Sequence, residues 1–429
     1  MRLGGRLSAA MDVLSDMDAR RRPVADALKD WGLSHRFAGS GDRAAIGNIV
    51  YDALRMKLSH AYAMGDDSPR AAVLAVMLRQ WGMEADGLAG DLEGDSFAPP
   101  MLSAAERDAF ETRDLASAPL DVQADLPAWI VPRFQQAFGD EWPAEAEAMT
   151  ARPPLDLRVN TLKATRDKVL KALDRTGAEP TAIAPQGLRI PPIIGAGRHP
   201  NVTSELSFQK GWFEVQDEGS QIVAALAGAM PGEKVLDFCA GGGGKTLALS
   251  ATMENKGQIH AFDADRTRLA PIIERLKRAG TRNVQVHDRL SALEPLRGRM
   301  DRVLVDAPCT GTGTWRRRPD TKWRLTEQQL SERCSQQDEV LRDAAAYVRP
   351  GGRLVYITCS VLPDENEARI AAFVADHPDF KPVPMQADWR TRFGEDAARP
   401  HATAQEGLLL TPRQTGTDGF FFAILERRA

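Results

Sequence analysis

Apolar positions recur at three- and four-residue spacing through the first third of the chain, a pattern typical of amphipathic helices. Residues 43–64 and 68–82 show it most clearly, and no strand-like alternation interrupts it. Residues 139–154 are polar and contain prolines, which indicates a linker. The pattern therefore predicts an all-helical region over residues 1–140.

A short mixed pattern follows between residues 150 and 215. Residues 155–161 and 187–192 have strand character, and residues 165–177 between them are typical of a helix that ends at Gly177. Two strands and one helix predict a small α/β subdomain in this part of the chain.

From about residue 216 onward, short apolar runs alternate with amphipathic helical segments. The helical segments are clearest at residues 266–280 and 325–348. Such alternation predicts a mostly parallel sheet covered on both faces, with ligands bound beyond the carboxyl ends of the strands. The strand candidates are residues 234–238, 257–263, 284–288, 301–308, 353–360 and 420–425.

A glycine-rich loop follows the first of these strands, where residues 235–246 read VLDFCAGGGGKT. A phosphate-binding P-loop would need a glycine at Cys239, and a dinucleotide-binding fingerprint would need one at Thr246. Both of these interpretations therefore fail on spacing, although glycines still allow a ligand to approach the backbone.

Three acidic residues end the first three strands in turn. Asp237 precedes the glycine loop, Asp263 can accept hydrogen bonds from ribose hydroxyls, and Asp288 can accept from an adenine amino group. Any one of them alone could be a helix cap or a loop residue. As a set at successive strand ends, they predict a bound nucleoside.

Cysteines occupy the ends of the next two strands. Asp306 and Cys309 follow the fourth strand, and Cys359 ends the fifth. A single cysteine is usually a small buried apolar residue, but two at adjacent strand ends beside a nucleoside site indicate thiol chemistry. We interpret both Cys334, within a helical run, and Cys239, which precedes the glycine loop, as structural.

Length and composition narrow the class further. A chain of 429 residues is long enough for two or three domains. No apolar run approaches the ~20 residues of a membrane span, and we expect no secretion signal in the first residues. The four cysteines match neither a disulfide framework nor a zinc site, so we expect no metal and a reducing, cytoplasmic location. The net charge of −4 leaves only local basic segments, at residues 19–23 and 314–324, to attract nucleic acid.

Several of these stretches resemble the motifs of S-adenosylmethionine-dependent RNA cytosine-5 methyltransferases, and residues 157–163 and 213–226 resemble the family's lead-in segments. The helical N-terminal part, with residues 41–55, is similar to the NusB-like RNA-binding domain of the RsmB branch. The motifs that carry the resemblance are DFCAGGGGKT (237–246), DAPCTGTG and RRRPDTKWR (within 306–324), VYITCSVLPDENE (355–367) and GTDGFFFAIL (416–425).

The resemblance implies a fold and a domain order. It implies an all-α NusB-like RNA-binding domain over residues 1–140 and a small α/β RNA-binding subdomain over 150–215. A Rossmann-like methyltransferase domain with a mostly parallel seven-stranded sheet would occupy residues 216–429. Asp418 would shape a turn before the last strand.

The resemblance also implies catalytic roles. Cys359 would attack cytosine C6 to form a covalent intermediate, Cys309 would assist release of the product, and Asp306 would contact the N3/N4 edge of the base. Cys309 remains an alternative nucleophile, because DNA cytosine methyltransferases use a Pro-Cys cysteine.

The implied cofactor is S-adenosylmethionine. Lys245 would lie near its methionine carboxylate or the loop backbone, although a solvent-facing helix position is the alternative. Gly241-Gly242 stands where the family has Ala-Pro, which predicts a less rigid loop. The predicted cofactor-binding residues are Asp237, Cys239, Ala240, Gly241, Gly242, Gly243, Gly244, Lys245, Asp263, Arg268, Asp288 and Asp306.

The expected partner is RNA, with 16S ribosomal RNA favoured by the RsmB-like N-terminus and transfer RNA as the second candidate. The sequence also leaves open an RNA-binding assembly factor with a vestigial site, a DNA cytosine-5 enzyme and a nicotinamide dehydrogenase. We expect a monomer. The basic residues expected to contact RNA phosphates are Arg316, Arg317, Arg318, Lys322 and Arg324.

Overall fold

The computed structural model describes residues 1–429, whose contacts divide them into two compact units. The helical unit comprises Met1–Pro153, Pro192–His199 and Thr314–Leu325. The sheet unit comprises Pro154–Pro191, Pro200–Gly313 and Thr326–Ala429. The small α/β part thus groups with the large sheet, and two short segments from later in the chain belong with the helices.

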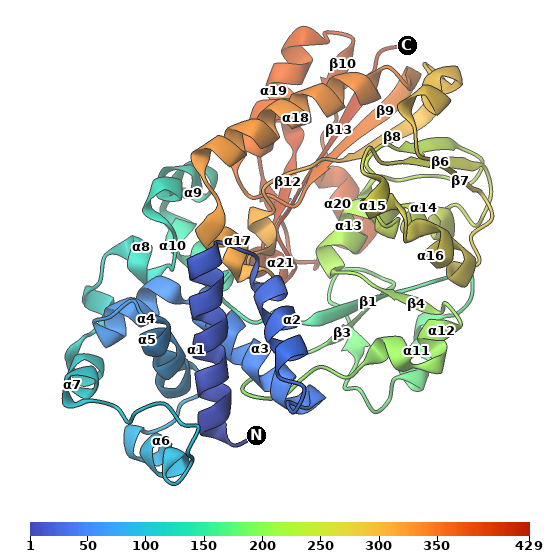
Figure 1. The fold of residues 1–429 in the computed structure, drawn as a ribbon. Coiled ribbons are helices and arrows are strands. Elements are labelled where there is room, and N and C mark those ends of the chain that lie inside the picture. Colours follow the sequence, from blue (N-terminus) through green and yellow to red (C-terminus); the bar gives the residue numbers. More distant parts are fainter. The chain divides into compact units, whose positions relative to one another are not determined.

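The helical unit carries the predicted α-helical pattern (Figure 1, blue to teal). Its helices are α1 (Leu3–Arg20), α2 (Val24–Ser34), α3 (Ser40–Arg55), α4 (Lys57–Met64), α5 (Pro69–Ala75), α6 (Ala85–Leu92), α7 (Ala104–Thr112), α8 (Leu120–Gln123), α9 (Val131–Phe138), α10 (Trp142–Ala148) and, from the later segment, α17 (Pro319–Arg324).

Two details of this unit differ from the sequence expectations. The pattern over 43–64 forms two helices, α3 and α4, which are separated at Met56. The prediction of a linker over residues 139–154 was wrong, because α10 lies there with Trp142 buried at its start. Pro143 stands in the first turn of that helix, where a missing backbone N–H costs nothing.

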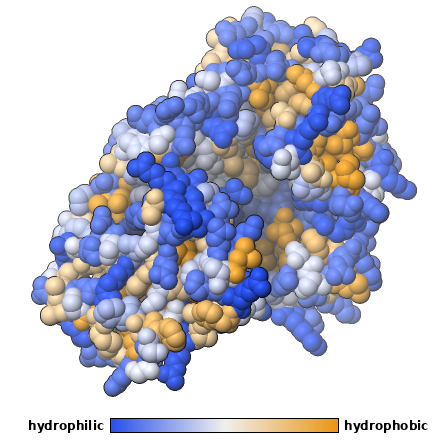
Figure 2. All heavy atoms as spheres, in the orientation of Figure 1, coloured by the Kyte–Doolittle hydropathy of each residue, from blue (hydrophilic) through white to orange (hydrophobic).

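The core of the helical unit joins α1, α3 and α5 through Leu7, Ile49 and Leu74, which are fully buried. No helix of the protein is long and apolar enough to cross a membrane. Figure 2 shows polar side chains over most of the visible face, with apolar ones in small groups.

The sheet unit begins with a four-stranded antiparallel sheet in the order β2-β3-β1-β4. The predicted strands and helix of the small α/β part are confirmed, although the helix ends at Ala172, before Gly177. The elements are β1 (Leu155–Val159), α11 (Arg166–Ala172), β2 (Glu179–Pro180), β3 (Gly187–Ile190), α12 (Leu206–Gln209) and β4 (Phe213–Val215).

The second sheet has nine strands in the order β11-β12-β13-β9-β8-β5-β6-β7, with β10 also paired to β13. The five strands from β7 to β9 are mutually parallel, and β13 closes the set antiparallel to β9. Seven strands were expected, and the sheet has nine: six main strands and the three short antiparallel strands β10, β11 and β12. The strands are β5 (Lys234–Asp237), β6 (Gln258–Phe262), β7 (Val284–His287), β8 (Met300–Asp306), β9 (Val348–Thr358), β10 (Phe380–Pro382), β11 (His401–Ala402), β12 (Leu408–Leu410) and β13 (Phe420–Arg427).

Helices connect and cover these strands (Figure 1). The segment 266–280 forms two helices instead of one, because Pro271 cannot donate a helical hydrogen bond. The helices are α13 (Glu218–Leu226), α14 (Gly244–Thr252), α15 (Arg266–Leu269), α16 (Ile272–Ala279), α18 (Glu327–Ala345), α19 (Glu367–Asp376), α20 (Gln386–Phe393) and α21 (Pro412–Thr415).

Alternation along the central strands sends side chains to both faces of the sheet. Leu304 and Val355 pack in one apolar cluster with Ile222 of α13 and Leu249 of α14. α18 packs against β8 and β9 as well. Chain order reverses at β5, which lies between β6 and β8, and ligands of such folds bind at this switch point.

Candidate active site

Two cysteines meet at the carboxyl ends of β8 and β9. The Sγ atoms of Cys309 and Cys359 lie 3.3 Å apart. The hydrogen bond to Cys359, together with burial, raises the pKa of the Cys309 thiol above its usual value. Either thiol can donate this hydrogen bond to the other.

The loops around the two sulfurs are joined by backbone hydrogen bonds. Gly313 donates to the carbonyl of Cys359 at 2.9 Å, and Gly419 donates to the carbonyl of Gly313 at 2.8 Å. A Cβ atom on Gly313 would lie 2.3 Å from the carbonyl oxygen of Gly419, so only glycine permits this approach. Asp418, expected to shape a turn, is buried next to this contact.

Lys245 and Asp306 form an ion pair at the same end of the sheet. Lys245 Nζ donates to Asp306 Oδ2 at 2.7 Å and lies 5.3 Å from the ring centre of Phe420. The Lys245 side chain is only 8% exposed, so the solvent-facing alternative for this residue was wrong. The Asp306 carboxylate, at 32% exposure, remains open to a ligand.

Asp237, at the end of β5, is almost fully buried. Burial raises the pKa of its carboxyl to about 7, although Thr246 Oγ1 donates to Oδ2 at 2.6 Å. The other oxygen, Oδ1, has no hydrogen-bond partner. An unpartnered buried carboxylate oxygen is costly unless a ligand donor completes it.

The glycine loop is held from two sides. Gly241 donates its backbone N–H to Asp263 Oδ2 at 2.8 Å, and Arg275 Nη1 donates to the carbonyl of Gly242 at 2.6 Å. Gly241 has a φ of +50° and Gly243 a φ of +79°, a backbone region that favours glycine. These contacts hold the loop that Gly241-Gly242 was expected to loosen.

The remaining predicted cofactor residues differ in exposure. Asp263 is buried, with Arg268 Nη1 4.0 Å away, whereas the Asp288 side chain is 57% exposed and pairs with Arg266 at 3.4 Å. Burial raises the pKa of the Cys239 thiol, as expected of a structural cysteine. Ala240 lies in the turn between β5 and α14, and Gly244 is the first residue of α14.

The predicted RNA-contact residues lie in the helical unit, and two of them are buried there. Lys322 Nζ donates to the carbonyl of Arg55, and Arg55 Nε donates to the carbonyl of Arg316. The expectation that Lys322 and Arg316 present charge to RNA phosphates was wrong, because both are almost inaccessible. Arg318 and Arg324 are exposed, and Arg317 is partly exposed.

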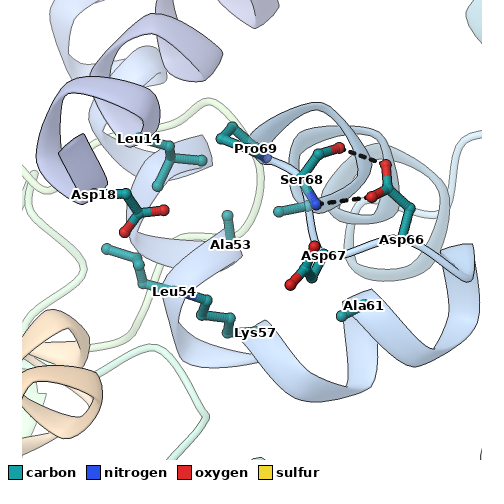
Figure 3. A pocket seen from close by; sticks show the side chains of 11 residues that line it. Leu14, Asp18, Ala53, Leu54, Lys57, Ala61, Asp66, Asp67, Ser68 and Pro69 are labelled. Atoms are coloured by element: carbon teal, nitrogen blue, oxygen red, sulfur yellow. Dashed lines mark hydrogen bonds between the residues drawn. The ribbon is translucent and has the colours of Figure 1, made fainter.

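A small cavity elsewhere in the helical unit contains none of the predicted residues (Figure 3). Ser68 donates from its backbone N–H and its hydroxyl to the Asp66 carboxylate there, which caps the turn before α5. The cavity is lined by Leu14, Asp18, Ala53, Leu54, Lys57, Ala61, Asp66, Asp67, Ser68, Pro69 and Ala72.

Sequence reasoning missed several residues that support the site. Thr246 and Arg275 were not singled out, although Thr246 lies inside the quoted glycine motif. Glu365 lies inside the motif that contains Cys359, and Gln337 lies within a long polar helix. The local pattern therefore assigns neither residue a role. The Thr246 contact lies within its own motif, whereas the other three residues bond to segments far away in the sequence, which local spacing cannot show.

Known proteins are similar to this chain in sequence and in fold. A family model described as 16S rRNA methyltransferase RsmB/F matches residues 224–426, and a model of the ferredoxin-like domain of the RsmF/B-like methyltransferases matches residues 126–192. A probable ribosomal RNA small subunit methyltransferase B of Synechocystis sp. is 34% identical over 332 residues, which cover 75% of this chain and 71% of that protein. The ribosomal RNA small subunit methyltransferase B of Cronobacter sakazakii is 36% identical over 304 residues.

The second of these matches covers 70% of this chain and 66% of the Cronobacter protein, just under two thirds of its length. Among solved structures, a methyltransferase homolog protein from Pyrococcus horikoshii superimposes with a TM-score of 0.60 at 29% identity, over 72% of this chain and 97% of that one. The fold and its strand-end site thus define a Rossmann-type methyltransferase that depends on S-adenosylmethionine. The chain belongs to the RsmB/F family of methyltransferases.

Proposed function

We propose that this protein methylates C5 of a cytosine in ribosomal RNA of the small subunit, with S-adenosylmethionine as the methyl donor. The names of the relatives support ribosomal RNA as the substrate. The 3.3 Å contact between the sulfurs of Cys309 and Cys359 supports a reaction that uses two thiols. A methyltransferase that modifies an exocyclic amine has no need of two thiols, because the substrate nitrogen attacks directly.

Cys359 is the proposed nucleophile. Its thiolate forms a bond to cytosine C6, and the electron pair of the C5–C6 double bond then makes C5 able to accept a methyl group. Once C5 carries the methyl group, a base or water takes the C5 proton, its electron pair re-forms the C5–C6 double bond, and the C6–S bond breaks to release the thiolate. Cys309, in contact with the Cys359 sulfur, assists this second half of the reaction.

Asp306 is proposed to hold the base. Its partly exposed carboxylate can contact the N3/N4 edge of cytosine, where a hydrogen bond stabilises the charge that builds up after thiolate addition. Lys245, bonded to Asp306 Oδ2, fixes the orientation of this carboxylate. The pair therefore orients the base relative to the two sulfurs.

The residues at the other strand ends fit S-adenosylmethionine, which supplies the methyl group when bound. The unpartnered Asp237 Oδ1 can accept a hydrogen bond from an amine, and the Asp263 carboxylate can accept from ribose hydroxyls. Asp288, at the end of β7, is placed for the adenine edge, and the glycines allow close approach of the methionine portion.

The helical unit and the small α/β part are proposed to select the RNA. Residues 1–140 would act as a NusB-like RNA-binding domain and residues 150–215 as a second RNA-binding element beside the methyltransferase domain. The target cytosine must be unpaired or flipped out of a helix to reach the thiols.

Replacement of each cysteine by alanine tests the chemistry. Cys309→Ala should accumulate a protein–RNA adduct that survives denaturing electrophoresis, and Cys359→Ala should form none. Cys334→Ala is the matched control and should behave as the wild type. Adduct from Cys359→Ala but not from Cys309→Ala would exchange the two roles.

Bisulfite sequencing of total RNA from source cells with and without the gene tests the substrate. One small-subunit ribosomal cytosine that loses protection in the deletion would support the proposal. A change confined to transfer RNA would retain the chemistry and replace the substrate.

A further inference from the structure

Glu365 lies behind the loop that carries Cys309. It belongs to the short helical turn η8 (Pro363–Glu365), a few residues after Cys359, and its side chain is completely buried. Neither sulfur is hydrogen-bonded to Glu365; its carboxylate contacts the neighbour of Cys309 instead. A buried carboxylate in this position needs partners, and the structure provides three.

Two of these partners belong to Thr310. Its backbone N–H donates to Glu365 Oε1 at 2.8 Å, and its hydroxyl donates to Oε2. The third is Gln337 of α18, whose Nε2 donates to Glu365 Oε1 and to the carbonyl of Pro308, each at 2.9 Å. Pro308 and Thr310 flank Cys309, so the Glu365–Gln337 pair fixes the backbone on both sides of this thiol.

The turn that carries Glu365 is itself anchored to β9. The Tyr356 hydroxyl donates to the Glu365 carbonyl at 2.7 Å, and Asn366 bonds both to Thr358 Oγ1 and to the Ser360 carbonyl. The Glu365 turn is therefore tied to β9 through its backbone carbonyl and Asn366, and to the loop after β8 through the Glu365 carboxylate. The Glu365 carboxylate also acts electrostatically on the Cys309 thiol.

We propose that Glu365 is a positioning residue with two effects. It fixes the Cys309 loop, and it keeps the proton of the hydrogen bond between the two sulfurs on Cys309. Cys359 is then the thiol that loses its proton and acts as the nucleophile. This inference rests on the cysteine roles of the proposed function. A negative charge beside Cys309 disfavours a second one on its sulfur, and the Glu365 charge adds to the raised pKa of Cys309.

Other charged and titratable groups surround Glu365 and Cys309, and a test must separate their effects from the effect of Glu365. Their number explains why a matched control of the same chemical type is needed. They are Tyr356 on β9 and Cys359 directly after it, Asp306 at the end of β8, Lys245 on α14, Cys334 on α18, and Arg369 on α19.

The test measures the alkylation rate of each cysteine by iodoacetamide between pH 6 and 10, with mass spectrometry of the full-length protein without RNA or cofactor. Glu365→Gln keeps the shape and removes the charge, so Cys309 should be alkylated roughly tenfold faster at pH 7.5, with its midpoint at lower pH. Glu367→Gln, the same change two residues away, should leave the profile of Cys309 unchanged. An unchanged midpoint in a folded Glu365→Gln protein, or an equal change in Glu367→Gln, would overturn the proposal.

Two neutral substitutions separate charge from loop support. Gln337→Met removes the bonds to the Pro308 carbonyl and to Glu365 Oε1 but keeps the charge of Glu365, so adduct formation with RNA should slow several-fold while the alkylation midpoint of Cys309 does not move to lower pH. A midpoint shifted as in Glu365→Gln would mean that loosening alone explains the effect. Thr310→Val removes a donor to the carboxylate and should slow Cys309 alkylation, which tests the charge even if Glu365→Gln does not fold; an unchanged rate would count against it.

Because alkylation requires neither catalysis nor RNA, its outcome is independent of the adduct test. Failure of the cysteine roles would appear as adduct formed by Cys359→Ala. Failure of the Glu365 proposal would appear as an unchanged Cys309 titration in a protein that still forms the expected adducts.

Discussion

Replacement of Asp237 by asparagine should change the pH dependence of folding. The carboxyl is almost completely buried at the end of β5, one of its oxygens has no partner, and burial raises its pKa from 3.8 to about 7. A carboxyl with a raised pKa contributes stability that is fully present below its unfolded pKa and is lost as the pH rises through the folded pKa.

The size of the effect follows from the difference between the ordinary pKa and the raised pKa of Asp237. Each pH unit corresponds to about 1.4 kcal/mol. The interval from 3.8 to about 7 therefore corresponds to roughly 4 kcal/mol of unfolding free energy, which the wild type loses between about pH 4 and pH 7. An asparagine side chain has no proton to lose in this range, so the difference between Asp237→Asn and wild type should move in favour of the variant by roughly 3 kcal/mol from pH 5 to pH 8.

Urea denaturation followed by circular dichroism at pH 5 and pH 8 measures this difference. Asp301→Asn is the control: partial burial raises the pKa of Asp301, but hydrogen bonds from Lys234 and Arg349 outweigh it and lower that pKa, so the difference between Asp301→Asn and wild type should be the same at pH 5 and pH 8. The amide group of asparagine can itself change the unfolding free energy. That change is the same at pH 5 and pH 8, so it cancels when the two pH values are compared. A difference between Asp237→Asn and wild type that is equal at pH 5 and pH 8 would refute the assignment of a raised pKa.

Three further changes test other parts of the structure. Arg275→Ala removes the bond to the glycine loop and should weaken S-adenosylmethionine binding by about tenfold in calorimetry; the exposed Lys277→Ala is the control, and equal losses would exclude a specific role. Trp315→Ala removes a buried ring from the helical unit and should lower its unfolding free energy by about 3–5 kcal/mol in urea titrations; a loss below about 1 kcal/mol would contradict its place in the core. Arg318→Glu should weaken RNA binding and reduce the salt slope by about one, whereas the buried Lys322→Met should leave the slope unchanged; equal slopes in both variants would refute the distinction.

The main architecture was predictable because each central strand is a short apolar run that ends in a polar residue. The strands before Asp237, Asp263 and Asp306 lie at the predicted positions. Breaks inside the helical stretches were harder to predict. The composition of 139–154 resembles a linker, and only tertiary burial of Trp142 reveals the helix there.

The candidate site was predictable in its members but not in their partners. The motif around Cys359 indicates a thiol at a strand end, and the structure adds the contact with Cys309. The basic run around Lys322 led to a wrong prediction of RNA contact for this residue, because local composition gives no sign that a lysine will be buried among helices. Support from Gln337 depends on a helix far along the chain, which spacing alone cannot show.

The segment Thr314–Leu325 restricts how this protein can be shortened. It follows the Cys309 loop directly, yet it packs among the N-terminal helices, with the Trp315 ring stacked on Phe134 and the Trp323 indole bonded to the Leu54 carbonyl. Deletion of the first 153 residues would expose both tryptophans and leave the charge of Lys322 without its carbonyl partner. A catalytic fragment must therefore replace Thr314–Leu325 with a short polar loop before it can be expressed alone.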